Sequence, residues 1–117
     1  MKNFSLIFGG CLVLGSLALA QVAGGFNTAD VKDFGVVTAA KFAVRTKNAS
    51  LGRSGSHAYK LLEVTKAKVQ VVAGLNYHLC FEVKFSDDSR SAEAVVYKDL
   101  RNKMTLNSWD WKACSIK

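Results

Sequence analysis

The chain has 117 residues, half of them apolar, and its 16 Lys and Arg against 9 Asp and Glu give a formal net charge of +7. This length fits one domain, and the composition is too apolar and too weakly charged for an intrinsically disordered protein. The lack of proline beside nine glycines excludes collagen-like and proline-rich chains. So short a chain also argues against a large enzyme with a deep, enclosed pocket.

The first twenty residues have the features of a secretory leader. Lys2 gives a positive start, residues 6–19 are apolar with many small side chains, and residues 18–20 (ALA) form a cleavage signal before Gln21. The apolar run is shorter than the ~20 residues that a membrane-spanning helix needs. We therefore predict a signal peptide over residues 1–20 and one domain over residues 21–117, in a secreted or periplasmic protein without a membrane span. A retained N-terminal anchor is the alternative.

Residues 31–48 are predicted to form the one helix. Thr28 and Asp30 precede it, and their side-chain oxygens can cap its first turn. Its apolar side chains recur at helical spacing and give one stripe, with the basic side chains largely outside it. The stripe consists of Val36, Val37, Ala40, Ala43 and Val44. At the end of the helix, residues 48–50 (NAS) form a sequon for N-glycosylation.

Strands are predicted to follow a loop at residues 51–56. In the first strand, which starts at Tyr59, the apolar positions change parity, and this predicts a β-bulge near Thr65–Lys66. The next strand, residues 75–86, is apolar at every odd position from Leu75 to Phe85, which is typical of a half-buried antiparallel strand.

Two more strands complete the predicted sheet. A turn at residues 87–89 leads into a strand over residues 91–98, and a turn at residues 99–103 leads into a last strand over residues 104–116. The sequence thus predicts an α+β fold in which the N-terminal helix packs on an antiparallel meander of four or five strands.

No group of residues in the sequence points to catalysis or metal binding. His78 precedes Cys80 by two residues on a strand, and such neighbours are roughly 6–7 Å apart, too far for a nucleophile and its base. His57 lies at a loop edge, and the histidines and cysteines fit no zinc motif. We therefore expect no enzyme activity, no metal site and no cofactor.

The basic residues are spread along the chain, and the aromatic residues fall at core positions instead of between the cations. A nucleic-acid-binding surface has a different pattern, so no nucleic acid partner is expected. Attraction to an anionic membrane, a polysaccharide or an acidic protein is left open.

Residues 70–74 (QVVAG) join the first two long strands. A turn must fall here because the alternation restarts at Leu75, and Gly74 can adopt the positive φ that closes such a turn. The apolar residues 71–73 are then expected at or near an exposed hairpin tip. Exposed apolar side chains at a tip indicate a binding surface, although an ordinary strand end gives the same pattern.

This segment resembles the Q-x-V-x-G motif of the cystatins, which are reversible protein inhibitors of papain-like cysteine proteases. The resemblance continues along the chain in the order of that family. Residues 22–25 (VAGG) resemble the N-terminal trunk of the family, and residues 42–50 resemble part of its helix. Residues 62–74 resemble its second strand, and residues 95–97 resemble the strand before its second hairpin. The predicted leader makes the chain similar to the secreted cystatins.

The resemblance implies an inhibitor that blocks a protease cleft without being consumed. Gly24 would let Val22 and Ala23 enter the unprimed substrate pockets, while two hairpin tips would fill the cleft beside the catalytic cysteine. Affinity would come from burying the valines on a preformed scaffold. The residues that the resemblance places on the protease are Val22, Ala23, Gly24, Gln70, Val71, Val72, Ala73, Gly74, Leu100 and Arg101.

The second hairpin departs from the family pattern. It usually carries Pro-Trp, whereas residues 99–102 of this chain read DLRN. Leu100 would supply a smaller apolar contact, and the loss of an aromatic anchor costs about 2 kcal/mol of binding free energy or more. Trp109 and Trp111 lie too far along the last strand to replace it, and we expect them to cover the sheet or a strand end.

Cys80 and Cys114 are a second departure, because secreted cystatins more often bridge adjacent strands. In a simple meander one strand separates these two cysteines, so their Cα atoms would be roughly 9–10 Å apart. A disulfide requires less than ~7 Å. Either the chain after Trp109 leaves the sheet and crosses back, or both thiols are free. Export slightly favours the disulfide.

Two functions follow from the sequence. The first is an inhibitor whose partner is a papain-like cysteine protease. The alternative is a non-inhibitory binding module of cystatin fold for anionic surfaces or partners. We expect a monomer, with exchange of the hairpin at residues 70–74 between two copies as a route to a dimer.

Overall fold

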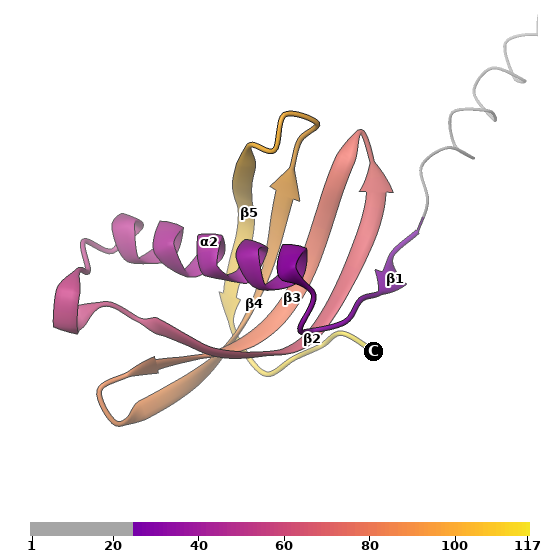
Figure 1. Cartoon of the computed structure of the whole chain (residues 1–117). Helices are drawn as coiled ribbons and strands as arrows, with labels where there is room; N and C mark the ends of the chain where they lie inside the picture. The colour runs from indigo at the N-terminus through magenta and orange to yellow at the C-terminus, as the bar shows by residue number, and fades with distance from the viewer. Residues whose placement is uncertain (1–24) are drawn as a thin grey trace, which may run out of the picture.

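The computed structural model describes residues 25–117 as a twisted antiparallel sheet with one helix lying across one of its faces (Figure 1). The elements are β1 (Asn27–Thr28), α2 (Phe34–Ser50), a 3₁₀ turn (Gly55–His57), β2 (Lys60–Val72), β3 (Gly74–Phe85), β4 (Asp88–Lys98) and β5 (Met104–Trp111). The strands pair in the order β1-β2-β3-β4-β5. The predicted α+β fold is therefore confirmed. The predicted leader at residues 1–20 and the residues Val22, Ala23 and Gly24 lie outside the described part of the chain.

Helix α2 begins at Phe34, three residues later than predicted. Its N-cap is Asp33, whose Oδ2 accepts hydrogen bonds from the N–H groups of Gly35 (3.0 Å) and Val36 (3.3 Å). The cap predicted at residues 28–30 is wrong, because Thr28 belongs to β1 and pairs with β2, while Asp30 closes a turn ahead of the helix. Asp30 and Asp33 both have the side chain of a helix N-cap, and the pairing of β1 with β2 determines that Asp33 caps the helix.

The buried face of α2 is built mainly of alanine and valine, which lets the helix lie close to the sheet. Its buried apolar residues are Val36, Ala39, Ala40, Ala43 and Val44. The predicted stripe is correct except that Val37 is half-buried and Ala39 is fully buried in its place. From the sheet, the odd positions of β3 meet this face, and Tyr77, Leu79, Phe81 and Val83 are all buried, as the alternation predicts.

Strand β2 contains two register shifts against β3, one between Leu61 and Glu63 and one between Val64 and Lys66. The second confirms the bulge predicted near Thr65–Lys66. Each extra residue changes which parity faces the helix, so Val64 and Ala67 are both buried although they differ in parity. The bulged strand curves strongly as it crosses Figure 1 beneath α2 and turns up toward the first hairpin tip.

The turns and strand ends at the C-terminal half differ slightly from the predictions. The β3–β4 turn consists of Ser86 and Asp87, with Ser86 at φ 55°, so β4 starts at Asp88 instead of Ser91. The second predicted turn, residues 99–103, is confirmed. Strand β5 ends at Trp111, and residues 112–117 form a tail without regular structure.

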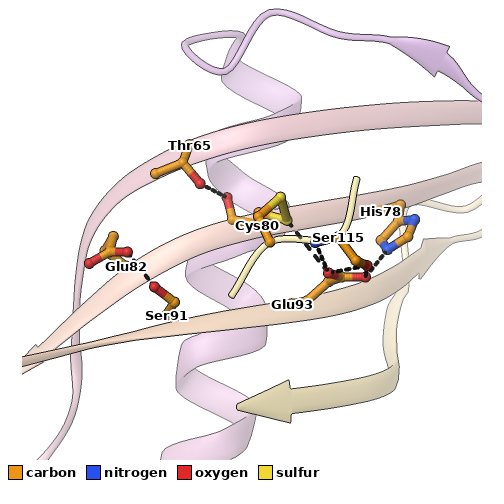
Figure 2. Close-up of a disulfide and its surroundings, with 8 residues drawn as sticks. Thr65, His78, Cys80, Glu82, Ser91, Glu93 and Ser115 are labelled. Carbon is orange, nitrogen blue, oxygen red and sulfur yellow. Dashed lines mark hydrogen bonds and ion pairs between the residues drawn. A yellow bond between two sulfur atoms is a disulfide. The ribbon is translucent and has the colours of Figure 1, made fainter. Parts of the chain in front are cut away.

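This tail crosses the sheet on the face opposite α2 and returns to β3 (Figure 2). Cys114 of the tail forms a disulfide with Cys80, with a Cα–Cα distance of 5.5 Å. The first of the two alternatives for the cysteines is thus the one in the structure, since the tail bypasses β4 to reach its partner strand. Ile116 is buried beyond the disulfide and helps to fix the tail.

Asn48 of the predicted sequon is a structural residue at the end of α2. It is buried, its Nδ2 donates to the carbonyl of Tyr59 (3.0 Å), and its Oδ1 accepts from the N–H of Tyr59 (2.8 Å). The side-chain amide that would carry a glycan is therefore engaged in joining the helix to the start of β2. Among residues 25–117, no helix combines the length and the apolar character that a membrane crossing requires.

Candidate functional site

Two hairpin tips lie side by side at one end of the sheet, at the top of Figure 1. The first joins β2 to β3 and the second joins β4 to β5. We call residues 70–74 and 98–103 together the tip edge. A groove of about 360 Å³ lies between the tips and is lined by residues of both, namely Val71, Val72, Gly74, Leu75, Lys98, Asp99, Leu100 and Asn102. The structure thus unites two segments that the sequence keeps far apart.

The first tip depends on Gly74, which has a φ of 111°. A Cβ atom at this position would collide with the carbonyl oxygen of Lys98 and would lie 3.0 Å from the Cα atom of Asp99. Glycine is therefore required both by the turn and by the close approach of the second hairpin. The positive φ predicted at this position is confirmed.

The apolar side chains of the first tip are open to solvent to different degrees. Val71 is 59% exposed and Ala73 is exposed, whereas Val72 is half-buried, and both valines line the groove. Gln70 lies below the tip on β2, where its Oε1 accepts a hydrogen bond from Nδ2 of Asn76 (3.2 Å). These residues thus lie together at the end of the first hairpin.

Tyr97 connects the two hairpins. Its hydroxyl donates a hydrogen bond to the carbonyl of Ala73 at the first tip. Together with the close packing of Gly74 against Lys98, this bond fixes the position of one tip relative to the other. An edge held in this way loses little conformational entropy when it binds a partner.

Asp99 closes the second tip. Its Oδ1 accepts hydrogen bonds from the N–H groups of Arg101 (2.8 Å) and Lys103 (2.9 Å), and its own N–H donates to the carbonyl of Lys103 (2.9 Å). Asn102 adopts a positive φ of 68° in the same turn. Leu100 projects from this turn and is 80% exposed, and Arg101 is exposed beside it.

Strand β1 brings the N-terminal part of the chain to the same end of the sheet. Asn27 pairs with Val69 and Thr28 with Lys68, so β1 runs antiparallel to β2 and its first residue is nearer to the tip edge. The ring of Phe26 lies 5.9 Å from that of His78, and Phe26 is 41% exposed. The expected contact residues Val22, Ala23 and Gly24 precede the described residues.

The two tryptophans lie away from the tip edge, as predicted. Trp109 packs on Phe81 and on Trp111, with ring centroids 5.1 Å apart in each pair. Both are half-buried against the core. They cover the sheet and add nothing to the second tip.

Glu93 organises a polar cluster beside the disulfide (Figure 2). It is 8% exposed, and its carboxylate accepts hydrogen bonds from the N–H and Oγ of Ser115, both at 2.8 Å. Nε2 of His78 lies 2.7 Å from the other carboxylate oxygen. Burial by itself raises the pKa of Glu93. The hydrogen bonds from Ser115 and His78 and the charge of Lys112 outweigh burial, and they lower the pKa to about 2.

This cluster is structural and has no nucleophile. Although His78 and Cys80 share a face of β3, the sulfur of Cys80 is bonded to Cys114 and the imidazole is bonded to Glu93. Cys80, Glu93 and Cys114 are the only group of metal-ligand type among residues 25–117, and the disulfide occupies both sulfurs.

Two features of the tip edge were missed at the level of sequence. The closure by Asp99 could have been recognised, because an aspartate at the start of a turn commonly accepts from the N–H groups that follow. The bond from Tyr97 to Ala73 could not, since it joins two different hairpins and depends on the register that pairs Asn76 with Tyr97.

The sequence matches known proteins along most of its length. A family model described as the cystatin domain matches residues 24–116. A cystatin from Naja kaouthia is 38% identical over 96 residues, which cover 79% of this chain and 67% of that protein. L-cystatin from Tachypleus tridentatus is 38% identical over 72 residues, covering 61% and 52%. The chain thus spans between about half and two thirds of the length of these relatives.

Solved structures agree with this match. Dimeric human cystatin F has a TM-score of 0.63 at 20% identity, covering 75% of this chain and 86% of that one. A salivary cystatin from the soft tick Ornithodoros moubata has a TM-score of 0.61 at 21% identity, covering 77% and 98%. These structures share the fold at low sequence identity. The domain match and the more similar relatives extend over most of the sequence, and together they show that the chain belongs to the cystatin family.

Proposed function

We propose that this protein is a reversible, tight-binding inhibitor of papain-like cysteine proteases and that it blocks their active-site cleft with the tip edge. The cystatin family and fold support a role as a cysteine protease inhibitor in general, and not as an enzyme. The observation that carries the finer proposal is the single edge formed by two hairpins, with Val71 and Leu100 exposed on it.

Apolar burial supplies the affinity in this proposal. Val71 and Leu100 each stand to gain about 1.5–3 kcal/mol if a protease cleft covers them fully. Because Asp99, Tyr97 and Gly74 already hold the edge in shape, little of this gain is lost to ordering. The second tip is also folded into a hydrogen-bonded turn, and the first tip is a tight hairpin bend at Ala73, so neither offers the protease a free extended segment to cleave.

The N-terminal trunk is proposed as a third contact. Val22 and Ala23 would enter the unprimed substrate pockets, and Gly24 would let the chain bend toward them. The direction of β1 supports this, because the chain approaches the sheet from the end where the tips lie. Gln70, Val72, Ala73, Gly74 and Arg101 complete the proposed contact surface.

Export is part of the proposal. The leader at residues 1–20 would direct the chain out of the cell, leaving residues 21–117 as the mature protein. The Cys80–Cys114 disulfide supports an oxidising destination, since disulfides persist in secreted and periplasmic proteins.

A non-inhibitory role as a binding module for anionic surfaces is the second candidate. It is favoured by the charges, because the described residues contain a single ion pair, between His78 and Glu93, and no lysine or arginine in that part of the chain is paired with a carboxylate. Such a module would bind anionic vesicles in a salt-sensitive manner and leave proteases active.

Titration of papain with residues 21–117 tests the proposal and separates the two candidates. We expect hydrolysis of a peptide substrate to fall to zero near equimolar inhibitor, and the inhibitor recovered from the complex to keep its intact mass. An uninhibited protease at micromolar inhibitor would overturn the proposed function, and binding to anionic vesicles in the same preparation would establish the alternative.

A further inference from the structure

The second tip carries a net positive charge, with Lys98, Arg101 and Lys103 against the single carboxylate of Asp99. Lys98, Arg101 and Lys103 flank the exposed Leu100 in the sequence of the tip, and Arg101 and Lys103 are themselves exposed. Within residues 25–117 the one ion pair joins His78 and Glu93, on a different part of the sheet. The three cations of the tip therefore have no acidic partner within 4 Å.

Asp99, the one acidic residue of the tip, is turned toward its own loop. Its Oδ1 accepts from the N–H groups of Arg101 (2.8 Å) and Lys103 (2.9 Å), and the residue is half-buried. The first tip, residues 70–74, contains no charged residue. A partner approaching the tip edge thus meets three cations and one internally engaged carboxylate.

Some cations elsewhere in the described chain are engaged with aromatic rings. Arg90 lies 3.8 Å from the ring centroid of Trp111, Arg53 lies 4.4 Å from that of Tyr59, and Lys47 lies 5.7 Å from that of Trp109. No such contact holds the tip cations in the described chain. Their charge is therefore available to an incoming partner.

We propose that the second tip steers the inhibitor toward papain-like proteases whose cleft rim is acidic where it receives Leu100. The inference rests on the proposed function and specifies its partner. Complementary charge at a rim raises the association rate constant and suppresses partners of like charge. Because the tip has no large aromatic anchor, Leu100 buries only a small apolar area in the protease. A higher association rate constant compensates for this by lowering the dissociation constant.

Stopped-flow association tests the inference with two proteases, papain and a papain variant that carries two added glutamates on the cleft rim beside the second tip. We expect the acidic-rim variant to associate about tenfold faster than papain at 50 mM NaCl. At 500 mM NaCl the two rate constants should agree within about twofold, because salt screens exposed charges.

Two charge-reversed inhibitors locate the effect. The variant R101E/K103E should associate faster with papain than with the acidic-rim protease. The control K60E/K84E makes the same change in net charge, but Lys60 and Lys84 face each other at the end of β3 remote from Gly74. This control should keep the preference of the unmodified inhibitor.

Equal association rates for the two proteases at 50 mM NaCl would overturn the inference while leaving inhibition itself intact. An equal loss of preference in K60E/K84E and R101E/K103E would also overturn it, because net charge and not the tip would then be responsible. Failure to inhibit either protease would refute the proposed function, and the inference with it.

Discussion

Gly74 is a point of close approach between the two hairpins. Its φ of 111° is rarely adopted by other residues, and a Cβ atom would meet the backbone of Lys98 and Asp99. The two constraints are independent, because the first is internal to the turn and the second comes from another hairpin. A substitution here affects the tip edge as well as the stability of the fold.

We expect Gly74→Ala to lower the free energy of unfolding by about 2–3 kcal/mol, measured by urea denaturation. The matched control is Gly52→Ala, where φ is +68° and no atom lies within 4 Å of the added Cβ. It should cost about 1 kcal/mol, from backbone strain alone. Equal losses in the two variants would show that the contact with the second hairpin is unimportant.

Glu93 makes the free energy of unfolding depend on pH. Its pKa is about 2 in the folded protein and 4.5 as the ordinary value, so the unfolded chain binds a proton more readily. The stabilisation is therefore present in full above about pH 5, and it is lost as the pH falls toward 2. In Glu93→Gln this part of the pH dependence is absent.

Urea unfolding of the unmodified protein and Glu93→Gln across pH 2–7 measures this effect. We expect the difference in free energy of unfolding between them to shrink steadily as the pH falls from about 5 toward 2. A difference that stays constant down to pH 2 would contradict the role given to the Glu93 carboxylate.

The first residue of α2 could not be predicted from the sequence alone. Asp30 and Asp33 both offer a carboxylate ahead of an apolar stripe, and only the pairing of Thr28 with Lys68 fixes which of them caps the helix. By contrast, the alternation of β3 and the bulge of β2 were predictable. Both follow from which side chains of a single strand must face the core.

Substitution of the two aspartates checks the observed cap. Asp33→Ala should lower the free energy of unfolding by about 1 kcal/mol, because two N–H groups of the first turn lose their acceptor. Asp30→Ala should have less than half of that effect. Chemical denaturation distinguishes the two, and the reverse order would favour the cap expected from the sequence.

Tyr97 acts between the two hairpins, and its hydroxyl bond to Ala73 affects the shape of the tip edge. We expect Tyr97→Phe to weaken papain binding about three- to tenfold, mainly through faster dissociation. The free energy of unfolding should fall by no more than about 1 kcal/mol. An unchanged dissociation rate constant would show that the tip edge does not depend on this hydrogen bond.

At the scale of the whole molecule, the disulfide joins the C-terminal tail to the centre of the sheet. The path of the tail could not be derived from sequence, since β5 ends at Trp111 and the return to Cys80 bypasses β4. The tip edge was likewise only partly predictable. Resemblance indicated its residues, whereas the contacts between its hairpins depend on the folded sheet.

We expect Cys80→Ser/Cys114→Ser to lower the free energy of unfolding by about 3–4 kcal/mol, because the disulfide closes a loop with a sequence separation of 34. The tail lies on the face of the sheet opposite α2 and away from the tips, so papain inhibition at temperatures where the variant is folded should be retained (Figure 1). Inhibition lost in a folded variant would place the tail in the binding surface.

If both hairpin tips enter one protease cleft, a charge on either tip must weaken binding, and the dissociation constants of three aspartate variants for papain measure this. Val71→Asp and Leu100→Asp each place a charge on one tip, whereas Leu62→Asp makes the same change at an exposed position, 52% accessible, elsewhere on β2. We predict that each tip variant raises the dissociation constant at least about tenfold and that Leu62→Asp leaves it unchanged. Tip variants that bind papain as tightly as the unmodified protein would show that the tips do not enter the cleft.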